Sequence, residues 1–271
     1  MSNGVDAFPP RSGGLLNEVR LQSRIIWALL LRELATRYGR NNIGFLWVAG
    51  EPMLFCFGVI VMWSLIRPPF EHGIGVVPFT VTGYLPLTLL RHVLGQGIPC
   101  LRVNSNLLYH KQISVLKLFI CRSLLEVVGI TAAFFVVTTT MCLMGYMEPP
   151  KNIGLVYMGW FLLAWIVFGM AMIFGCLAQL SDVVERAMNL LTYIMIPMTG
   201  TFYMIAWIPY KYRSTVEKIP LVNCMEMIRK GFFGEFTPAY YRPGYTVAWA
   251  LCLTFVGLLL TRIVRDHIEM E

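Results

Sequence analysis

Long blocks of apolar residues alternate with short polar stretches along most of this chain. A block of about 20 apolar residues is long enough to cross a bilayer as a helix, and six blocks of roughly that length can be recognised. The second is rich in proline and glycine, so we expect kinks or a break in it. The six predicted transmembrane helices cover residues 43–66, 74–97, 123–144, 153–178, 187–208 and 245–261.

Two further segments have helical patterns but are unsuited to crossing a membrane. Residues 15–41 hold a seven-residue apolar core flanked by arginines, which predicts an amphipathic helix lying in the cytoplasmic interface. Within residues 209–244, apolar side chains recur at helical spacing at Met225, Ile228, Phe232 and Phe233. Charged residues occupy the other faces of that helix: Glu226, Arg229 and Lys230. We expect a short amphipathic or re-entrant helix between the last two spans, on the periplasmic side.

Composition supports the same class of protein. The chain is 57% hydrophobic and 14% charged, with a mean hydropathy of +0.64, whereas about a quarter of the residues of a soluble domain are charged. The sequence therefore predicts an all-α integral membrane protein. The net charge of +7 does not indicate nucleic-acid binding, because the cations lie next to the apolar blocks and form no basic run.

The distribution of Lys and Arg predicts the orientation in the membrane. With six spans, the side that holds both termini carries twelve of these cations, while the short loops of the opposite side carry two. Because short cytoplasmic loops are enriched in Lys and Arg, we expect both termini in the cytoplasm. Residues 1–42 would form a cytoplasmic tail and interfacial helix, and residues 43–271 a transmembrane domain.

The motifs of soluble enzymes are missing. The chain has no GxxxxGK[ST] nucleotide loop, no HExxH and no GxSxG, and its four histidines are scattered. Five of the seven cysteines fall in apolar blocks and there is no CxxC, so neither a disulfide framework nor a zinc site is expected. We therefore expect no cofactor or metal on this chain and no enzymatic activity of its own.

Two motif clusters point to a family. Around the first span they are Leu31-Arg32-Glu33-Leu34, Thr36-Arg37-Tyr38-Gly39, Ile43-Gly44-Phe45-Leu46-Trp47 and Glu51-Pro52. Between the last two spans the cluster is Ile219-Pro220-Leu221-Val222-Asn223, followed by Glu226 and Arg229. In order and spacing these elements resemble ABC-2 type permeases, most closely the KpsM-type permeases of capsular polysaccharide exporters. The family commonly has Asn-Pro where this chain has Asn223-Cys224, which leaves the local turn in doubt.

The resemblance implies a function and a set of partners. Two copies of such a permease form a channel in the bacterial inner membrane, and each is docked on a cytoplasmic ATPase subunit. The two ATPase subunits bind ATP and Mg, and hydrolysis drives a lipid-linked polysaccharide across the membrane. A periplasmic adaptor of the polysaccharide co-polymerase class and an outer-membrane exporter complete the path.

Cations and one carboxylate near the first span are candidate substrate residues. Arg32, Arg37 and Arg40 match the geometry of phosphate, so they are suited either to the substrate's lipid phosphate or to anchoring in bulk lipid. Glu51 lies about 12 Å into the span, where an ionisable side chain faces either a cavity or a structural partner. As a channel residue it would accept hydrogen bonds from sugar hydroxyls.

Aromatic side chains form a second candidate group, because the apolar face of a sugar ring can stack on them. The candidates are Trp47, Phe55, Trp63, Tyr84, Tyr193, Phe202, Tyr203 and Trp207. The alternative is membership of the aromatic belts at the membrane interfaces. Tyr193 fits that alternative least, because it lies near the middle of the fifth span.

The longest cytoplasmic connection holds the predicted coupling segment. It reads Asn104, Ser105, Asn106, Leu107, Leu108, Tyr109, His110 and Lys111, with a helix cap followed by a short helix. The resemblance makes residues 104–113 the helix that fits a groove of the ATPase; the alternative is a plain connecting turn. Nearby, Arg122 and Glu126 are spaced to neutralise each other on one helix, and Arg91 and His92 are expected to be structural.

These elements suggest a mechanism in three parts: capture of the lipid anchor near the N-terminal helix, passage of the glycan along the first and fifth spans, and coupling through residues 104–113. The same architecture would serve O-antigen, teichoic acid or a small drug as cargo. A drug exporter needs a closed apolar pocket, whereas a glycan path needs a continuous polar and aromatic groove. The alternative from another class is a membrane-embedded lipid or sugar transferase.

Overall fold

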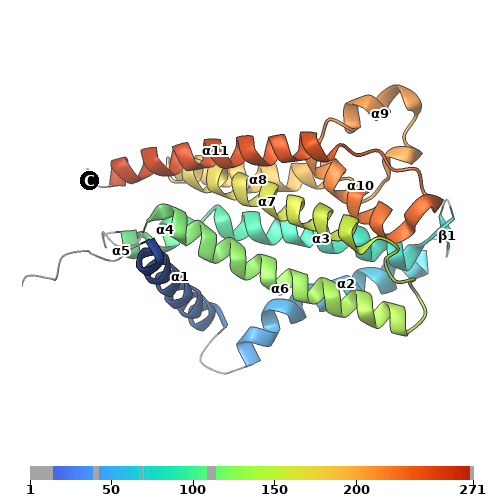
Figure 1. The fold of residues 1–271 in the computed structure, drawn as a ribbon, viewed down its shortest axis with the longest axis horizontal. Coiled ribbons are helices and arrows are strands. Elements are labelled where there is room, and N and C mark those ends of the chain that lie inside the picture. Colours follow the sequence, from blue (N-terminus) through green and yellow to red (C-terminus); the bar gives the residue numbers. More distant parts are fainter. Residues whose placement is uncertain are drawn as a thin grey trace, which may run out of the picture.

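The computed structural model describes residues 15–38, 43–66, 68, 70–71, 73–108 and 114–268. Nearly all of them are helical (Figure 1). The longer helices are α1 (Leu15–Tyr38), α2 (Ile43–Ile66), α3 (Val76–Gly97), α6 (Val115–Leu143), α7 (Ile153–Ala178), α8 (Asp182–Met195), α10 (Pro220–Phe233) and α11 (Pro243–Ile268). The short elements are β1 (Phe70–Glu71), β2 (Ile74–Gly75), α4 (Cys100–Val103), α5 (Ser105–Leu108), η1 (Ile196–Thr199), η2 (Ile205–Trp207), α9 (Tyr210–Val216) and η3 (Gly234–Phe236).

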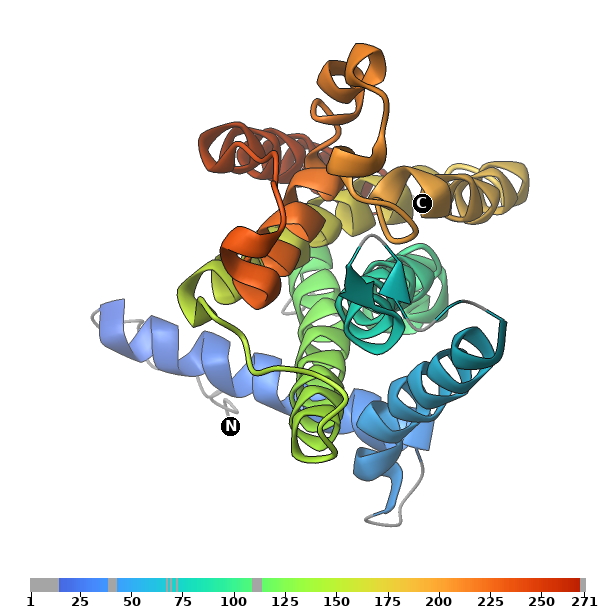
Figure 2. The ribbon, with the colours of Figure 1, turned by 90° about the vertical axis from the view of Figure 1, so that its right-hand side faces the viewer.

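The bundle has two distinct ends. Helices α1, α4 and α5 and the last turns of α11 lie at one, which we call the α1 end (Figure 1). At the other, the hairpin end, β1 and β2 pair antiparallel, with Phe70 opposite Gly75, and α9 and α10 lie beside them. Figure 2, viewed from the hairpin end, shows that α1 lies across the bundle rather than along it.

Within the described residues, four helical stretches are long and apolar enough to cross a membrane: Ala49–Ile66, Val115–Leu143, Ile153–Ala178 and Pro243–Arg265. They correspond to the first, third, fourth and sixth predicted spans. The third begins at Val115 rather than at residue 123, and the helix of the sixth continues to Ile268. The chain is therefore a helical protein with several segments able to cross a membrane.

The second and fifth predicted segments differ from expectation. Of the kinks or break expected in the second, the break is absent, because α3 is one continuous helix that includes Pro86. The fifth was predicted as one helix over residues 187–208, and this is wrong. Helix α8 begins earlier, where the Ser181 hydroxyl caps it by accepting from the Val184 N–H at 3.3 Å. It ends at Met195, and the chain then turns through η1 to Gly200, whose φ is +79°.

Helix α7 is the centre of the bundle because three glycines on different sides of it allow close approach. A Cβ at Gly159 would lie 2.9 Å from the Cys224 carbonyl oxygen of α10. One at Gly169 would lie 2.9 Å from Leu253 Cβ of α11. Small residues that let backbones come together are a main source of helix association in membranes.

The third of these glycines, Gly175, faces α3 and α6. A Cβ there would lie 2.5 Å from the Gly97 carbonyl oxygen and 2.6 Å from the Phe119 ring. Real Cβ atoms do not approach other atoms so closely. This contact therefore sets the distance between α7 and both of its neighbours.

Helix α1 is fastened to the bundle by two buried side chains, Leu29 and Glu33. Leu29 is buried in a cluster with residues of α4, α6 and α7. Glu33, also buried, pairs with Arg122 Nε of α6 at 2.9 Å, and Arg122 Nη1 donates to the Gln96 carbonyl of α3 at 3.1 Å.

The predicted pairing of Arg122 with Glu126 is therefore wrong. Arg122 pairs with Glu33, and Glu126 Oε2 lies 3.2 Å from His92 Nδ1 of α3. Helices α1 and α3 pack against α6, and each supplies the partner of one α6 charge: Glu33 for Arg122 and His92 for Glu126. Arg122 and Glu126 are thus each paired across a helix interface.

Gly175→Ala should destabilise the fold. The added methyl group must displace the α3 backbone or the Phe119 ring, at a cost of about 1–3 kcal/mol. The measurement is thermal unfolding of the protein purified in detergent, and we expect a lower Tm. Gly244→Ala is the matched control, because a Cβ at this position of α11 meets nothing within 4 Å. Equal Tm values for the two variants would contradict close packing at Gly175.

Candidate functional site

A pocket of about 370 Å³ lies between α2, α3 and α8. Figure 2 shows α2 and α8 on either side of α3. The pocket is lined by Glu51, Pro52, Phe55, Tyr84, Leu87, Thr88, Arg91, His92, Gly95, Asn189, Thr192 and Tyr193. Its volume is in the range of small-ligand sites. Four predicted site residues meet here, since Glu51, Phe55, Tyr84 and Tyr193 all line it.

Helical spacing explains why these residues meet. On α3 the lining positions 84, 87, 88, 91, 92 and 95 recur every three or four residues, so they share one face of the helix. Arg91 of this face places its guanidinium 5.5 Å from the centre of the Tyr193 ring of α8. The pocket thus combines aromatic rings, hydroxyl and amide groups, a carboxyl group and a cation.

The sequence pattern missed several residues of this pocket. Arg91 was expected to be structural, and Thr88, Asn189 and Thr192 were not considered. The signal that could have found Arg91 and Thr88 is the polar stripe along residues 84–95, within a segment predicted to cross the membrane. Asn189 and Thr192 carry no such signal, because their contribution depends on how α8 lies against α3.

The other predicted aromatic residues lie elsewhere. Trp47 lines a neighbouring groove on α2, about 370 Å³ in volume, which it shares with Glu51 and Phe55. At the hairpin end, Phe202 stacks on Trp63 with 6.0 Å between ring centres. Trp207 stacks on Phe79 at 5.0 Å. The structure therefore divides the predicted aromatic residues among the pocket, the groove on α2 and ring stacks at the hairpin end.

At the α1 end, a predicted substrate residue touches the predicted coupling segment. Arg32 Nη2 donates to Asn104 Oδ1 at 2.5 Å and lies 3.5 Å from Glu33 Oε2. Asn104 is buried, and its Nδ2 donates to the Cys100 carbonyl at 2.9 Å. Ser105 begins the short helix α5, which agrees with the expected short helix.

Several predicted residues fall outside what the structure describes. These are Arg40, Tyr109, His110 and Lys111 entirely, and the side chains of Arg37, Asn106 and Leu108. The prediction for them stays untested.

A further contact links α4, which directly precedes the coupling segment, to α8. Arg102 Nη1 of α4 lies 2.5 Å from both Asp182 Oδ1 and Glu185 Oε2, which are in the first turn of α8. Carboxylates are favourable at that position of a helix because of its dipole. No side chain of α8 is fully buried, and this ion pair helps to position the helix beside the pocket.

At the hairpin end, Arg229 of α10 is completely buried and holds the chain between η1 and η2. Its Nη1 donates to the carbonyls of Gly200 and Tyr203, and its Nη2 to that of Thr201, each at 2.6 Å. The guanidinium also lies 4.3 Å from the centre of the Phe79 ring of α3. One side chain thus satisfies three buried carbonyl groups that no helix pairs.

Glu226 and Asn223 accept hydrogen bonds from backbone N–H groups of the segments that flank α10. Glu226 Oε1 accepts from the Ile205 N–H at 3.1 Å, and its Oε2 accepts from the Tyr240 N–H at 3.2 Å. Asn223 Oδ1 accepts from the Arg242 N–H at 2.8 Å. Burial lowers the pKa of Arg229 to about 10 and raises that of Glu226, while their opposite charges counteract both shifts.

The sequence placed Glu226 and Arg229 on the polar faces of a short amphipathic helix, and the structure shows that these faces are covered. Both are buried, because the loops on either side of α10 fold over those faces and supply hydrogen-bond partners. Among the described residues, no three His, Cys, Asp or Glu side chains are placed to hold a metal ion.

Comparison with known proteins identifies the family. The chain is 33% identical over 251 residues to the capsule polysaccharide export inner-membrane protein BexB of Haemophilus influenzae, covering 93% of this chain and 95% of that protein. It is 34% identical to the capsule polysaccharide export inner-membrane protein CtrC of Neisseria meningitidis serogroup B, with the same coverage. The chain belongs to the family of capsule polysaccharide export inner-membrane proteins.

A more distant relative agrees with this assignment. The polysialic acid transport protein KpsM of Escherichia coli is 23% identical over 243 residues, which cover 89% of this chain and 94% of that protein. No family model matches the chain. The resemblance read from the two motif clusters is confirmed, and the inner-membrane location of the capsule polysaccharide export proteins agrees with the four apolar helices.

Membership of the capsule polysaccharide export family also gives the second motif cluster a structural meaning. Its three polar residues, Asn223, Glu226 and Arg229, are spaced at i, i+3 and i+6, and each binds the backbone of a flanking loop. Cys224, where the family commonly has proline, lies inside the first turns of α10, which begins at Pro220. The doubtful turn is therefore a helix in this chain.

Arg229→Met should destabilise the hairpin end. It leaves the carbonyls of residues 200, 201 and 203 buried without donors, at a cost of at least about 2 kcal/mol. Thermal unfolding in detergent should show a clearly lower Tm, and limited proteolysis should show faster cleavage between η1 and η2. Lys230→Met is the neighbouring control, since in the described part of the chain Lys230 pairs with the exposed Glu235 and a single backbone carbonyl. A wild-type Tm for Arg229→Met would show that the hydrogen bonds from Arg229 to these three carbonyls do not stabilise the fold.

Proposed function

We propose that this chain is the permease subunit of an ABC exporter that moves lipid-linked capsular polysaccharide across the inner membrane. The observation that carries the proposal is identity of about a third, over nearly the full length of both chains, with two proteins named for capsule polysaccharide export. ATP hydrolysis takes place in a separate subunit, which binds ATP and Mg. This chain binds neither and is not itself an enzyme.

The proposed topology has six passes. The four apolar stretches provide four of them. Helix α3 is the second pass, and its polar residues are tolerated because most of its side chains are buried among other helices. Helix α8 and the turns after it are the fifth. The α1 end then faces the cytoplasm with both termini, and α10 is held at the periplasmic side by the loops folded over it.

A second copy of the chain completes the channel. The pocket between α2, α3 and α8 is open, and the flanking helices present apolar side chains outward, among them Leu54 and Phe55 of α2 and Leu190 of α8. Pairing two such faces would enclose a passage lined by both pockets. In this arrangement the polar side chains of both pockets face the passage rather than lipid, where they would be costly.

The pocket's chemistry favours a glycan over a drug. A small apolar drug requires a closed apolar cavity, whereas this pocket is open and combines Phe55, Tyr84 and Tyr193 with hydrogen-bonding groups. The aromatic faces can stack on sugar rings, and Glu51 and Arg91 can bind hydroxyl or acidic groups. The glycan passes between α2 and α8, which are the first and fifth passes.

The substrate's lipid anchor is captured near α1. Arg32, Arg37 and Arg40 form a cationic stretch at the start of the first pass, and guanidinium groups match phosphate geometry. Arg32 also binds Asn104, so a phosphate that draws Arg32 away would act directly on the coupling segment.

The coupling segment, residues 104–113, docks on the ATPase and transmits its movement to α8. The ion pairs of Arg102 with Asp182 and Glu185 join α4, which directly precedes this segment, to α8, whose far end carries Tyr193. Displacement of α4 would thereby shift one wall of the pocket. A periplasmic adaptor of the co-polymerase class and an outer-membrane exporter receive the glycan beyond this membrane.

Tyr193→Ala should impair export without impairing assembly. The variant removes an aromatic face from the pocket and the contact with Arg91, so we expect surface polysaccharide to fall about two- to five-fold. The measurement is complementation of a deletion strain, with surface glycan quantified on intact cells. Tyr157→Ala is the control, because Tyr157 is 65% exposed on α7, outside the pocket. Wild-type export by Tyr193→Ala would remove this residue from the glycan path. Full surface glycan in the deletion strain would contradict the proposal that this chain exports the polysaccharide.

Arg102→Glu should uncouple ATP hydrolysis from export. Placing three carboxylates together repels α4 from α8, so we expect at least about ten-fold less glycan exported per ATP hydrolysed, with the subunits still assembled. The charge-swapped double variant, Arg102→Glu with Glu185→Arg, should recover much of the loss. Arg262→Glu, at an exposed position of α11 near the same end, serves as the control. Unchanged coupling in Arg102→Glu would exclude this contact from the transmission path.

A further inference from the structure

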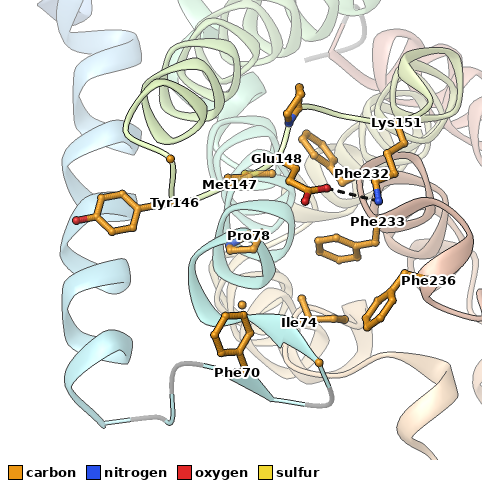
Figure 3. A pocket seen from close by; sticks show the side chains of 14 residues that line it. Phe70, Ile74, Pro78, Tyr146, Met147, Glu148, Lys151, Phe232, Phe233 and Phe236 are labelled. Carbon is orange, nitrogen blue, oxygen red and sulfur yellow. Dashed lines mark ion pairs between the residues drawn. The ribbon is translucent and has the colours of Figure 1, made fainter.

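A second pocket of the described chain is separate from the one between α2, α3 and α8. It has a volume of about 630 Å³ and opens at the hairpin end (Figure 3). Three walls form it: the β1–β2 hairpin with the start of α3, the connection between α6 and α7, and the end of α10 with η3. Nothing in the proposed export path uses this site.

The walls of this pocket are held in place before any ligand arrives. Each turns at a glycine in the left-handed region: Gly73 at φ +81°, Gly145 at +75° and Gly234 at +64°. A Cβ at Gly73 would lie 2.8 Å from the Phe236 ring, so the hairpin touches η3. The Asn152 N–H donates to the Gly231 carbonyl at 2.8 Å, which fastens the α6–α7 connection to α10.

The lining combines aromatic rings with charged groups. Phe70, Phe233 and Phe236 lie around the opening, whereas Tyr146 points away from it (Figure 3). Phe70 is 71% exposed and Phe236 is 64% exposed, so their rings are available to a ligand. At the opposite wall, Lys151 Nζ and Glu148 Oε2 form an ion pair at 3.5 Å.

This combination matches a sugar. A pyranose has an apolar C–H face that can stack on a ring, and a rim of hydroxyl groups that can bond to a carboxylate or an ammonium group. An acyl chain fits poorly, because the pocket lies beyond the ends of the apolar helices α6 and α7, at Leu143 and Ile153, and has a charged wall. Its volume is that of a small-ligand site.

We propose that this pocket binds a short oligosaccharide segment of the exported glycan after it has crossed the membrane. Sugar rings stack on Phe70 and Phe236, while Glu148 and Lys151 bind hydroxyl or acidic groups on the opposite side. The proposal rests on the proposed function, because it takes the exported glycan as its ligand. Binding here would hold the emerging chain on the periplasmic side.

The test is binding to the full-length protein purified in lipid nanodiscs. The probe is a set of fragments of four to eight sugars, released by partial hydrolysis from the capsule of the strain that encodes the chain. Binding is followed by saturation-transfer NMR and quantified by thermophoresis. We expect Phe70→Ala and Phe236→Ala each to weaken binding about three- to ten-fold, the amount expected for one aromatic contact. Phe135→Ala, at a 69% exposed position of α6 outside the pocket, should bind like the wild type.

Three results would overturn the proposal. They are no fragment binding by the wild type, equal binding by the Phe70 and Phe236 variants, and a photo-crosslinker at position 70 that captures a periplasmic protein and no glycan. The last result would assign the pocket to a protein partner. Failure here is distinguishable from failure of the proposed function, because export by the deletion strain complemented with the wild-type chain is measured independently of fragment binding.

Discussion

Close approach of backbones around α7 is the constraint on which the rest of the structure depends. Gly159, Gly169 and Gly175 admit α10, α11 and the α3–α6 pair on different sides of one helix. In a bilayer, apolar side chains gain little by leaving lipid for one another, so contact area and backbone proximity stabilise a bundle instead. With α7 surrounded in this way, α2 and α8 remain at the periphery of the bundle, and the pocket between them stays open.

A second constraint comes from three buried charged residues, Arg229, Glu226 and Arg122, each of which binds a different segment of the chain. Arg229 holds three carbonyls beyond η1, Glu226 holds two backbone N–H groups, and Arg122 joins Glu33 of α1 to the end of α3. A polar group in a medium without water is costly unless it is paired. These side chains therefore decide where irregular backbone can lie, at the hairpin end and at the α1 end. The candidate sites for the glycan, the lipid anchor and coupling all lie next to such points.

The sequence predicted elements well where one property dominated a whole segment. The bounds of α2 match the first predicted span, and α7 matches the fourth, because each is a continuous apolar block. The sequence-based prediction failed where a few residues decided the start and end of a helix. The predicted fifth helix ignored Ser181, Pro197 and Gly200, which start α8 early and end it at Met195. Of the candidate site, Glu51, Phe55, Tyr84 and Tyr193 were anticipated, and Arg91 was assigned to structure.

By itself, the sequence determined the class of protein, the family and the polar residues that are candidates for the site, because apolar block length and motif spacing are local properties of the chain. Only the tertiary structure decided how those residues combine. The pairing of Arg122 with Glu33 rather than Glu126, the link from Arg102 to α8 and the burial of Glu226 and Arg229 all join segments far apart in sequence. Such contacts depend on how closely helices approach, and that distance is set by packing against neighbours rather than by any pattern within one helix.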